Sequence, residues 1–103
     1  MIFQNNTITC LVTEDKITPE VDPFVYHNNT KFLKVKFTSD WRSYRTVAAF
    51  FVKDNEVAMP IEHGRCQIPK EALDSGYFRV SVSGLYRDGT IKQTNKLLAI
   101  KEG

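Results

Sequence analysis

The stretch FRVSVS, residues 78–83, decides the fold class of this chain. Its apolar phenylalanine and valines alternate with arginine and serine, a period of two that is typical of a strand with one buried and one exposed face. Asp88-Gly89 follows as a strong signal for a tight hairpin turn, and residues 90–92 lead the chain back. This segment therefore predicts a half-buried pair of antiparallel strands.

Further strands are expected on both sides of this pair. Alternation of apolar and polar side chains returns over residues 7–13 and 31–38, and residues 97–101 supply a last strand. Pro69 suits the first position of a helix, so a single helical turn is expected near residues 69–74. The whole pattern predicts an all-β fold, namely an antiparallel two-sheet, immunoglobulin-like β-sandwich with that one short helical turn.

The composition is that of one folded domain. The chain has 103 residues, 42% hydrophobic and 25% charged, so residues 1–103 are expected to form a single β-sandwich domain. The formal net charge of +2 falls far short of the basic face of a nucleic-acid binder. No apolar run is long enough to span a bilayer, and the start of the chain does not resemble a signal peptide. We therefore expect synthesis in a cytoplasm and neither a membrane nor a nucleic acid as partner.

The two cysteines, Cys10 and Cys66, could form a disulfide between sheets or remain two buried thiols. An immunoglobulin disulfide has a tyrosine two residues before its second cysteine and a tryptophan not far after the first. Gly64 occupies the tyrosine position here, and Trp41 follows Cys10 too far along the chain. Because no secretion signal is recognised either, the sequence favours two buried free thiols.

No pattern of catalytic or metal-binding residues is recognised. Cys10, Cys66, His27 and His63 do not fall into the paired spacing that structural zinc sites use. A nucleophilic pair of Cys66 with either histidine stays formally open, but a small apolar residue in a strand explains Cys66 more simply. The glycines form no phosphate-binding loop. The sequence therefore predicts a protein that is not an enzyme and that holds no cofactor and no metal ion.

The aromatic residues admit two interpretations. Several rings on one face, together with Arg42, Arg45, Arg79 and Arg87, would suit stacking on single-stranded nucleic acid. A sandwich of this size needs most of its large side chains for its core, so we favour packing. The rings concerned are Trp41, Tyr44, Phe50, Phe51, Tyr77, Phe78 and Tyr86.

Residues 46–53 (TVAAFFVK) are apolar on both faces, which predicts a central strand or a strand with one face against a partner. Val47, Ala49 and Phe51 form one row, opposite the row that contains Phe50. This second row could be core beneath the long loop or a subunit interface, and the sequence leaves both open.

A series of short motifs runs through the chain between residues 7 and 101. In order, the motifs are Ser39-Asp40-Trp41, Phe50-Phe51, Cys66-Gln67-Ile68-Pro69, the strand from Tyr77 to Val82, Gly84 and Thr94-Asn95. This order resembles the N-terminal β-sandwich module of phage baseplate upper proteins, and of related fibre-type virion proteins of phages of Gram-positive bacteria. The core and motif positions expected to be structural are Trp41, Phe50, Cys66, Pro69, Phe78, Val80, Val82 and Gly84.

The resemblance implies a virion part, made in the cytoplasm of a bacterial host, that anchors a fibre on the baseplate or decorates the particle. Such modules usually act as symmetric oligomers, often trimers, so the expected partners are other virion proteins and further copies of the chain. The alternative is a small phage-encoded regulator or inhibitor that binds a host protein or a nucleic acid in solution.

Overall fold

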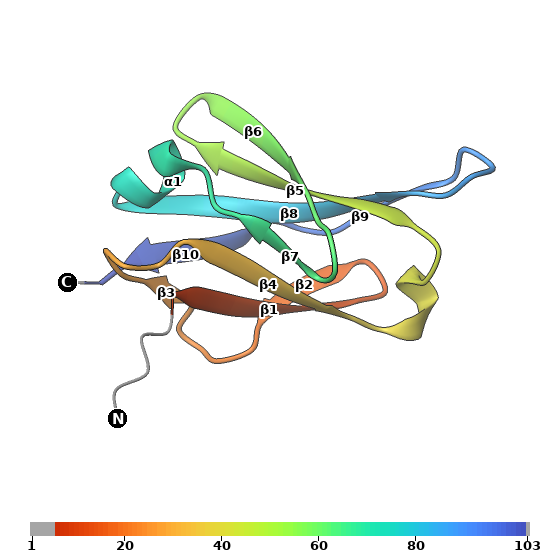
Figure 1. The fold of residues 1–103 in the computed structure, drawn as a ribbon, viewed down its shortest axis with the longest axis horizontal. Coiled ribbons are helices and arrows are strands. Elements are labelled where there is room, and N and C mark those ends of the chain that lie inside the picture. The colour runs from red at the N-terminus through yellow and green to blue at the C-terminus, as the bar shows by residue number, and fades with distance from the viewer. Residues whose placement is uncertain (1–5, 103) are drawn as a thin grey trace.

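Two β-sheets pack face to face in this computed structural model, which describes residues 6–102 (Figure 1). Sheet A has the strand order β2-β1-β4-β7, and sheet B has the order β3-β10-β8-β5-β6, with β9 paired to β8. The predicted all-β sandwich with one short α-helical turn is confirmed. The elements are β1 (Thr7–Thr13), β2 (Lys16–Pro19), β3 (Val25–Tyr26), β4 (Phe32–Phe37), the 3-10 turn η1 (Ser39–Trp41), β5 (Arg45–Val52), β6 (Asn55–Pro60), β7 (Arg65–Gln67), α1 (Lys70–Asp74), β8 (Tyr77–Leu85), β9 (Ile91–Gln93) and β10 (Leu97–Lys101).

Strand β8, which contains the FRVSVS stretch, organises sheet B. It pairs antiparallel with β5, with β10 and, through the predicted hairpin, with β9. The order β10-β8-β5-β6 is that of the G, F, C and C′ strands in variable-type immunoglobulin sheets. Sheet B is therefore immunoglobulin-like, as predicted.

The two sheets are mixed rather than purely antiparallel. β1 pairs with β4 in parallel, with Cys10 opposite Val35, and β3 pairs with β10 in parallel, with Val25 opposite Ile100. The prediction of antiparallel pairing is wrong for these two pairs. The reason is connectivity: after the β1–β2 hairpin the chain crosses to sheet B as β3 before it returns as β4. A parallel pair requires such a crossover.

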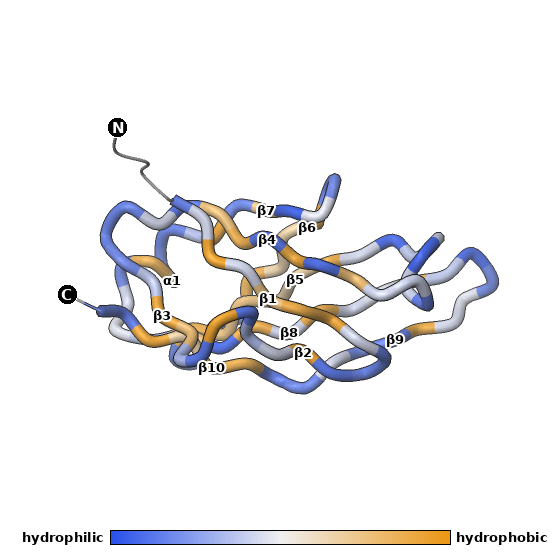
Figure 2. Tube along the Cα trace, turned by 90° about the horizontal axis from the view of Figure 1, so that it is seen from below, coloured by the Kyte–Doolittle hydropathy of each residue, from blue (hydrophilic) through white to orange (hydrophobic). Residues whose placement is uncertain are grey.

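The core lies between the sheets, where the hydrophobic strand segments of Figure 2 meet, while the hydrophilic segments lie mostly at the turns. All eight positions predicted to be structural are buried. They are Trp41, Phe50, Cys66, Pro69, Phe78, Val80, Val82 and Gly84.

Tyr26 is a core residue that the sequence pattern did not single out. Its side chain is fully buried, and its ring centroid lies 4.9 Å from that of Phe78. Its hydroxyl donates hydrogen bonds to the carbonyl oxygens of Ser75 and, at 3.2 Å, of Ala72. These bonds tie β3 to the end of α1, and burial raises the pKa of Tyr26.

Thr94-Asn95 links the two sheets at their edge. Thr94 Oγ1 accepts a hydrogen bond from the Val82 amide at 2.9 Å and donates to the Asn95 carbonyl at 2.8 Å. The Asn95 side chain accepts a bond from the Ile17 amide at 2.9 Å and donates to the Ile17 carbonyl at 3.4 Å. Asn95 thus pairs with β2 of sheet A as a strand backbone would, which gives this dipeptide a structural role.

Candidate interaction surface

Strand β5 divides its side chains between the core and the outer face of sheet B, which is the face turned away from sheet A. Phe50 is fully buried between the sheets. The second row points the other way: Val47 and Phe51 are half-buried on the outer face, and Ala49 between them is 8% exposed. This places the row away from residues 14–23, whose strand β2 belongs to sheet A.

Small side chains keep the middle of the outer face flat. Ala49 lies opposite Ser81 of β8 on one side and Ala58 of β6 on the other. One step further along the strands, Val47 lies opposite Ser83. The strip itself contains no large side chain, and neighbouring side chains already cover Ala49 and Ser81.

Apolar side chains gather at both ends of this flat strip. Ile100 of β10 lies opposite Tyr77 of β8, Leu98 lies one row further in, and Leu85 lies opposite Ile91 at the far end. Soluble monomers rarely expose large apolar patches, so such a face indicates binding to another surface. These five are on the outer face, and they make up all but one of the six exposed large hydrophobic residues found in residues 6–102: Tyr77 (48% exposed), Leu85 (49%), Ile91 (69%), Leu98 (40%) and Ile100 (48%).

Sequence reasoning identified the β5 row, and it named Tyr77 only as one ring of a possible nucleic-acid-stacking set; it missed Leu85, Ile91, Leu98 and Ile100. The available signal was the alternation itself. Tyr77 lies two residues before the polar Arg79, and Leu85 lies two residues after the polar Ser83. Because side chains two residues apart on a strand point the same way, Tyr77 and Leu85 share the solvent-facing side of β8.

Charged and polar groups lie among the apolar ones. Lys96 Nζ is 4.1 Å from the centroid of the Phe51 ring, and Phe51 lies between Arg79 of β8 and Glu56 of β6. Ser81 Oγ is buried and, within the described residues, has no hydrogen-bond partner. The outer face therefore combines apolar contact area with the cations Arg79 and Lys96 and the carboxylate of Glu56, while the Ser81 hydroxyl lies buried.

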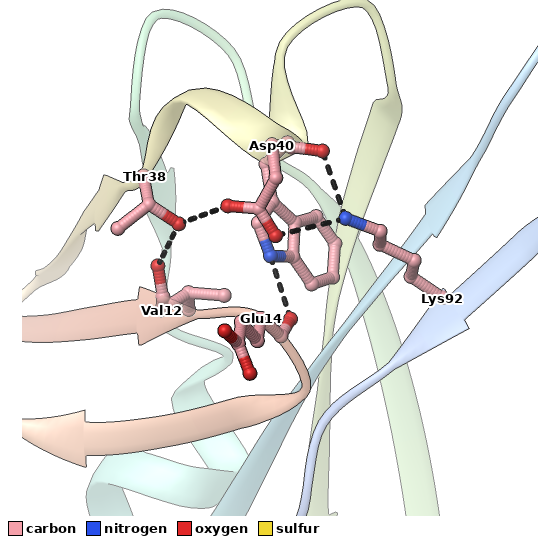
Figure 3. A network of polar contacts seen from close by, with 6 residues as sticks. Val12, Glu14, Thr38, Asp40 and Lys92 are labelled. Atoms are coloured by element: carbon pink, nitrogen blue, oxygen red, sulfur yellow. Dashed lines mark hydrogen bonds and ion pairs between the residues drawn. The ribbon is translucent and has the colours of Figure 1, made fainter.

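A chain of four aromatic rings lies at the end of the sandwich opposite α1, next to η1. The ring centroids of Phe37 and Trp41 are 5.5 Å apart, those of Trp41 and Tyr44 5.8 Å, and those of Tyr44 and Tyr86 5.2 Å. Trp41 is 3% exposed, and its Nε1 donates a hydrogen bond of 2.8 Å to the Glu14 carbonyl (Figure 3). Two further rings of the predicted stacking set, Phe50 and Phe78, lie in the core. The seven rings therefore do not share one exposed face.

A polar network closes over these rings (Figure 3). Lys92 Nζ donates to the carbonyl oxygen of Asp40 at 2.8 Å and to its carboxylate at 3.0 Å, and lies 5.2 Å from the Trp41 ring centroid. Thr38 Oγ1 also donates to that carboxylate. The hydrogen bonds from Thr38 and Lys92 lower the pKa of Asp40. The network fixes η1 against β9.

Gly84 is required because Trp41 and Tyr44 occupy the space above it. A Cβ atom at this position would lie 2.8 Å from Cζ3 of Trp41 and 3.1 Å from Cβ of Tyr44. We expect Gly84→Ala to lower the free energy of unfolding by about 1–3 kcal/mol, measured by urea denaturation. Gly76→Ala is the control, because a Cβ there meets nothing within 4 Å. Equal stability of the two variants would contradict this packing.

The two thiols flank β4 within one sheet. Cys10 of β1 lies opposite Val35, and Cys66 of β7 lies opposite Leu33. Two strand spacings separate β1 from β7 by about 10 Å, whereas bridged cysteines need Cα atoms within about 7 Å. Both cysteines are free and buried, as predicted. Burial raises the pKa of each thiol to about 12, which keeps both protonated and unreactive.

These buried thiols predict a loss of stability at high pH. The folded state holds their protons more tightly than the unfolded chain does, because the pKa rises from 9.0 to about 12 on folding. Their contribution is therefore complete below pH 9.0 and is lost as the pH rises toward 12. Urea midpoints should fall across this range, and less steeply in a Cys10→Ala/Cys66→Ala variant. Rapid reaction of the native thiols with a disulfide reagent at neutral pH would contradict their burial.

Within residues 6–102, no three His, Cys, Asp or Glu side chains form a group that could hold a metal ion. The helices described there are all too short or too polar to cross a membrane. The chain matches no protein-family model, no curated protein and no solved structure.

Proposed function

We propose that the protein is a structural part of a phage virion, as a baseplate, fibre-anchoring or decoration component, and that it acts through protein–protein contacts without catalysis. The outer face of sheet B carries this proposal, because five exposed large hydrophobic residues gather on one side of a small domain. The motif order that resembles phage baseplate modules supports the same role. Its place of action is then the virion, after synthesis in the cytoplasm of a bacterial host.

The proposed partners are other virion proteins and further copies of the chain, with a trimer favoured. The row of Val47, Ala49 and Phe51 crosses the middle of the outer face, between the two apolar groups. In a trimer, this face of one copy packs against a different surface of the next, and the ring closes after three copies.

Mass spectrometry of purified, washed particles tests this role. For the phage that encodes the chain, we expect its peptides in infectious particles at a fixed ratio to the other structural proteins. A chain that is abundant in the lysate and missing from washed particles would overturn the virion role. That result would favour the soluble regulator or inhibitor.

A further inference from the structure

A hollow of about 340 Å³ lies at one end of the outer face. At this end β5 begins and the β8–β9 hairpin extends beyond the rest of the sheet (Figure 1). Arg45 is the first residue of β5 and lies opposite Leu85, the last residue of β8. The hollow is therefore continuous with the apolar group formed by Leu85 and Ile91. Its lining residues are Ser43, Arg45, Leu85, Tyr86, Arg87 and Gly89.

Two arginines in this hollow have no carboxylate partner among the described residues. The ion pairs found in residues 6–102 are formed by other side chains, none of which is an arginine. Arg45 and Arg87 are both exposed. The Arg87 guanidinium lies 5.6 Å from the centroid of the Tyr86 ring, which holds it at the rim. The nearby Asp88 carboxylate instead accepts a hydrogen bond of 2.9 Å from the Thr90 amide. Two uncompensated guanidinium groups therefore face one hollow.

One apolar side chain, Leu85, lines the hollow beside these arginines. Leu85 and Ile91 are cross-strand partners, and both are exposed. A guanidinium group binds a carboxylate through paired, charge-assisted hydrogen bonds, and an exposed leucine–isoleucine pair offers contact to an apolar side chain. A ligand that matches the hollow carries an acidic group next to an apolar one.

We propose that this hollow binds an acidic segment of a partner protein, with one carboxylate between Arg45 and Arg87 and a neighbouring apolar side chain on Leu85 and Ile91. This inference rests on the proposed function only in that the protein acts by binding other proteins. Charge complementarity selects the occupant, because the two guanidinium groups that line the hollow match the negative charge of an acidic segment.

Single-stranded nucleic acid fits the hollow less well. Binding of bases relies on exposed aromatic faces, whereas the Tyr86 ring packs on Tyr44 at 5.2 Å and Trp41 is 3% exposed. The exposed large hydrophobic side chains at this end of the face, Leu85 and Ile91, are aliphatic. The observations therefore favour a peptide.

The test is an NMR titration of the full-length, ¹⁵N-labelled protein with an acetylated and amidated LDLDL peptide. We expect amide shifts confined to the start of β5 and to the β8–β9 hairpin, with weaker binding at high salt. An Arg45→Gln/Arg87→Gln variant should raise Kd by at least about tenfold. Arg65→Gln, an exposed arginine of β7 in sheet A and therefore outside both the hollow and the outer face of sheet B, should leave Kd unchanged.

Three results would overturn the inference. These are equal binding of an LNLNL peptide, amide shifts centred elsewhere, and tighter binding of a short thymidine oligonucleotide at the same amides. None of them bears on whether the chain is found in purified particles, so a failure here is distinct from a failure of the virion role.

Discussion

A Phe51→Asp variant is expected to fold as the parent protein does and to lose its assembly, whereas Phe50→Asp is expected to unfold the domain. The two residues are neighbours on β5 and carry the same side chain, but they point to opposite faces of sheet B. This pair of variants therefore separates the core from the proposed interface.

The difference follows from what surrounds each ring. Phe50 is fully buried, and its ring packs on Phe78 at 5.6 Å between the centroids. A carboxylate there would be buried without a partner, at a cost above about 4 kcal/mol. At position 51 the new carboxylate would lie at the surface, opposite Arg79 on one side and Glu56 on the other and close to Lys96, so that two cations offset the one neighbouring carboxylate.

Circular dichroism measures whether each variant is folded, and light scattering measures whether it assembles. Phe51→Asp should keep the parent spectrum and run as a monomer, and Phe50→Asp should lose the strand spectrum. Unfolding by both variants would show that Phe51 belongs to the core, and the interface proposal for the β5 row would then be wrong.

Trp41→Ala is expected to lower the free energy of unfolding by about 3–5 kcal/mol, the usual cost of removing a buried large aromatic side chain. The change removes the middle of the aromatic chain, because the Trp41 ring contacts both Phe37 and Tyr44. It also leaves the Glu14 carbonyl without its 2.8 Å bond from the indole.

Trp41→Phe is the matched control, since it keeps a ring against Tyr44 and loses the indole hydrogen bond. It should cost clearly less than Trp41→Ala in urea denaturation followed by circular dichroism. A Trp41→Ala variant as stable as the parent would show that η1 and the aromatic end do not contribute to the fold's stability.

The fold class could be predicted because burial of one strand face leaves a direct trace in the sequence. In β8 the alternation of Phe78, Val80 and Val82 with polar residues matches the observed burial except at Ser81, which is only 1% exposed. The helical turn near residues 69–74 was also predictable from Pro69, although the predicted position of that residue is wrong by one: Pro69 is the N-cap, with ψ at 145°, and Lys70 is the first residue of α1.

Features that depend on long-range pairing could not be predicted in this way. The parallel pairing of β1 with β4 follows from the excursion of the chain through sheet B, and no local pattern encodes it. Tyr26 lies in a strand of two residues, too short to show a period. The prediction that both thiols are free rested on the absence of immunoglobulin motifs and of a secretion signal. The structural reason is different, because β4 separates Cys10 from Cys66.

The candidate surface could be predicted only in part from the sequence, for a related reason. Alternation tells which residues of one strand share a face, and so it identified Val47, Ala49 and Phe51. It does not tell which strands become neighbours. Only the pairing of β10 with β8 brings Leu98 and Ile100 beside Tyr77.

Light scattering of the purified chain over a range of concentrations tests most directly whether the outer face of sheet B is an interface. We predict a trimer, with three times the 11.8 kDa mass of the chain, that dissociates in the Phe51→Asp variant. A mass of 11.8 kDa at every concentration would contradict assembly through this face.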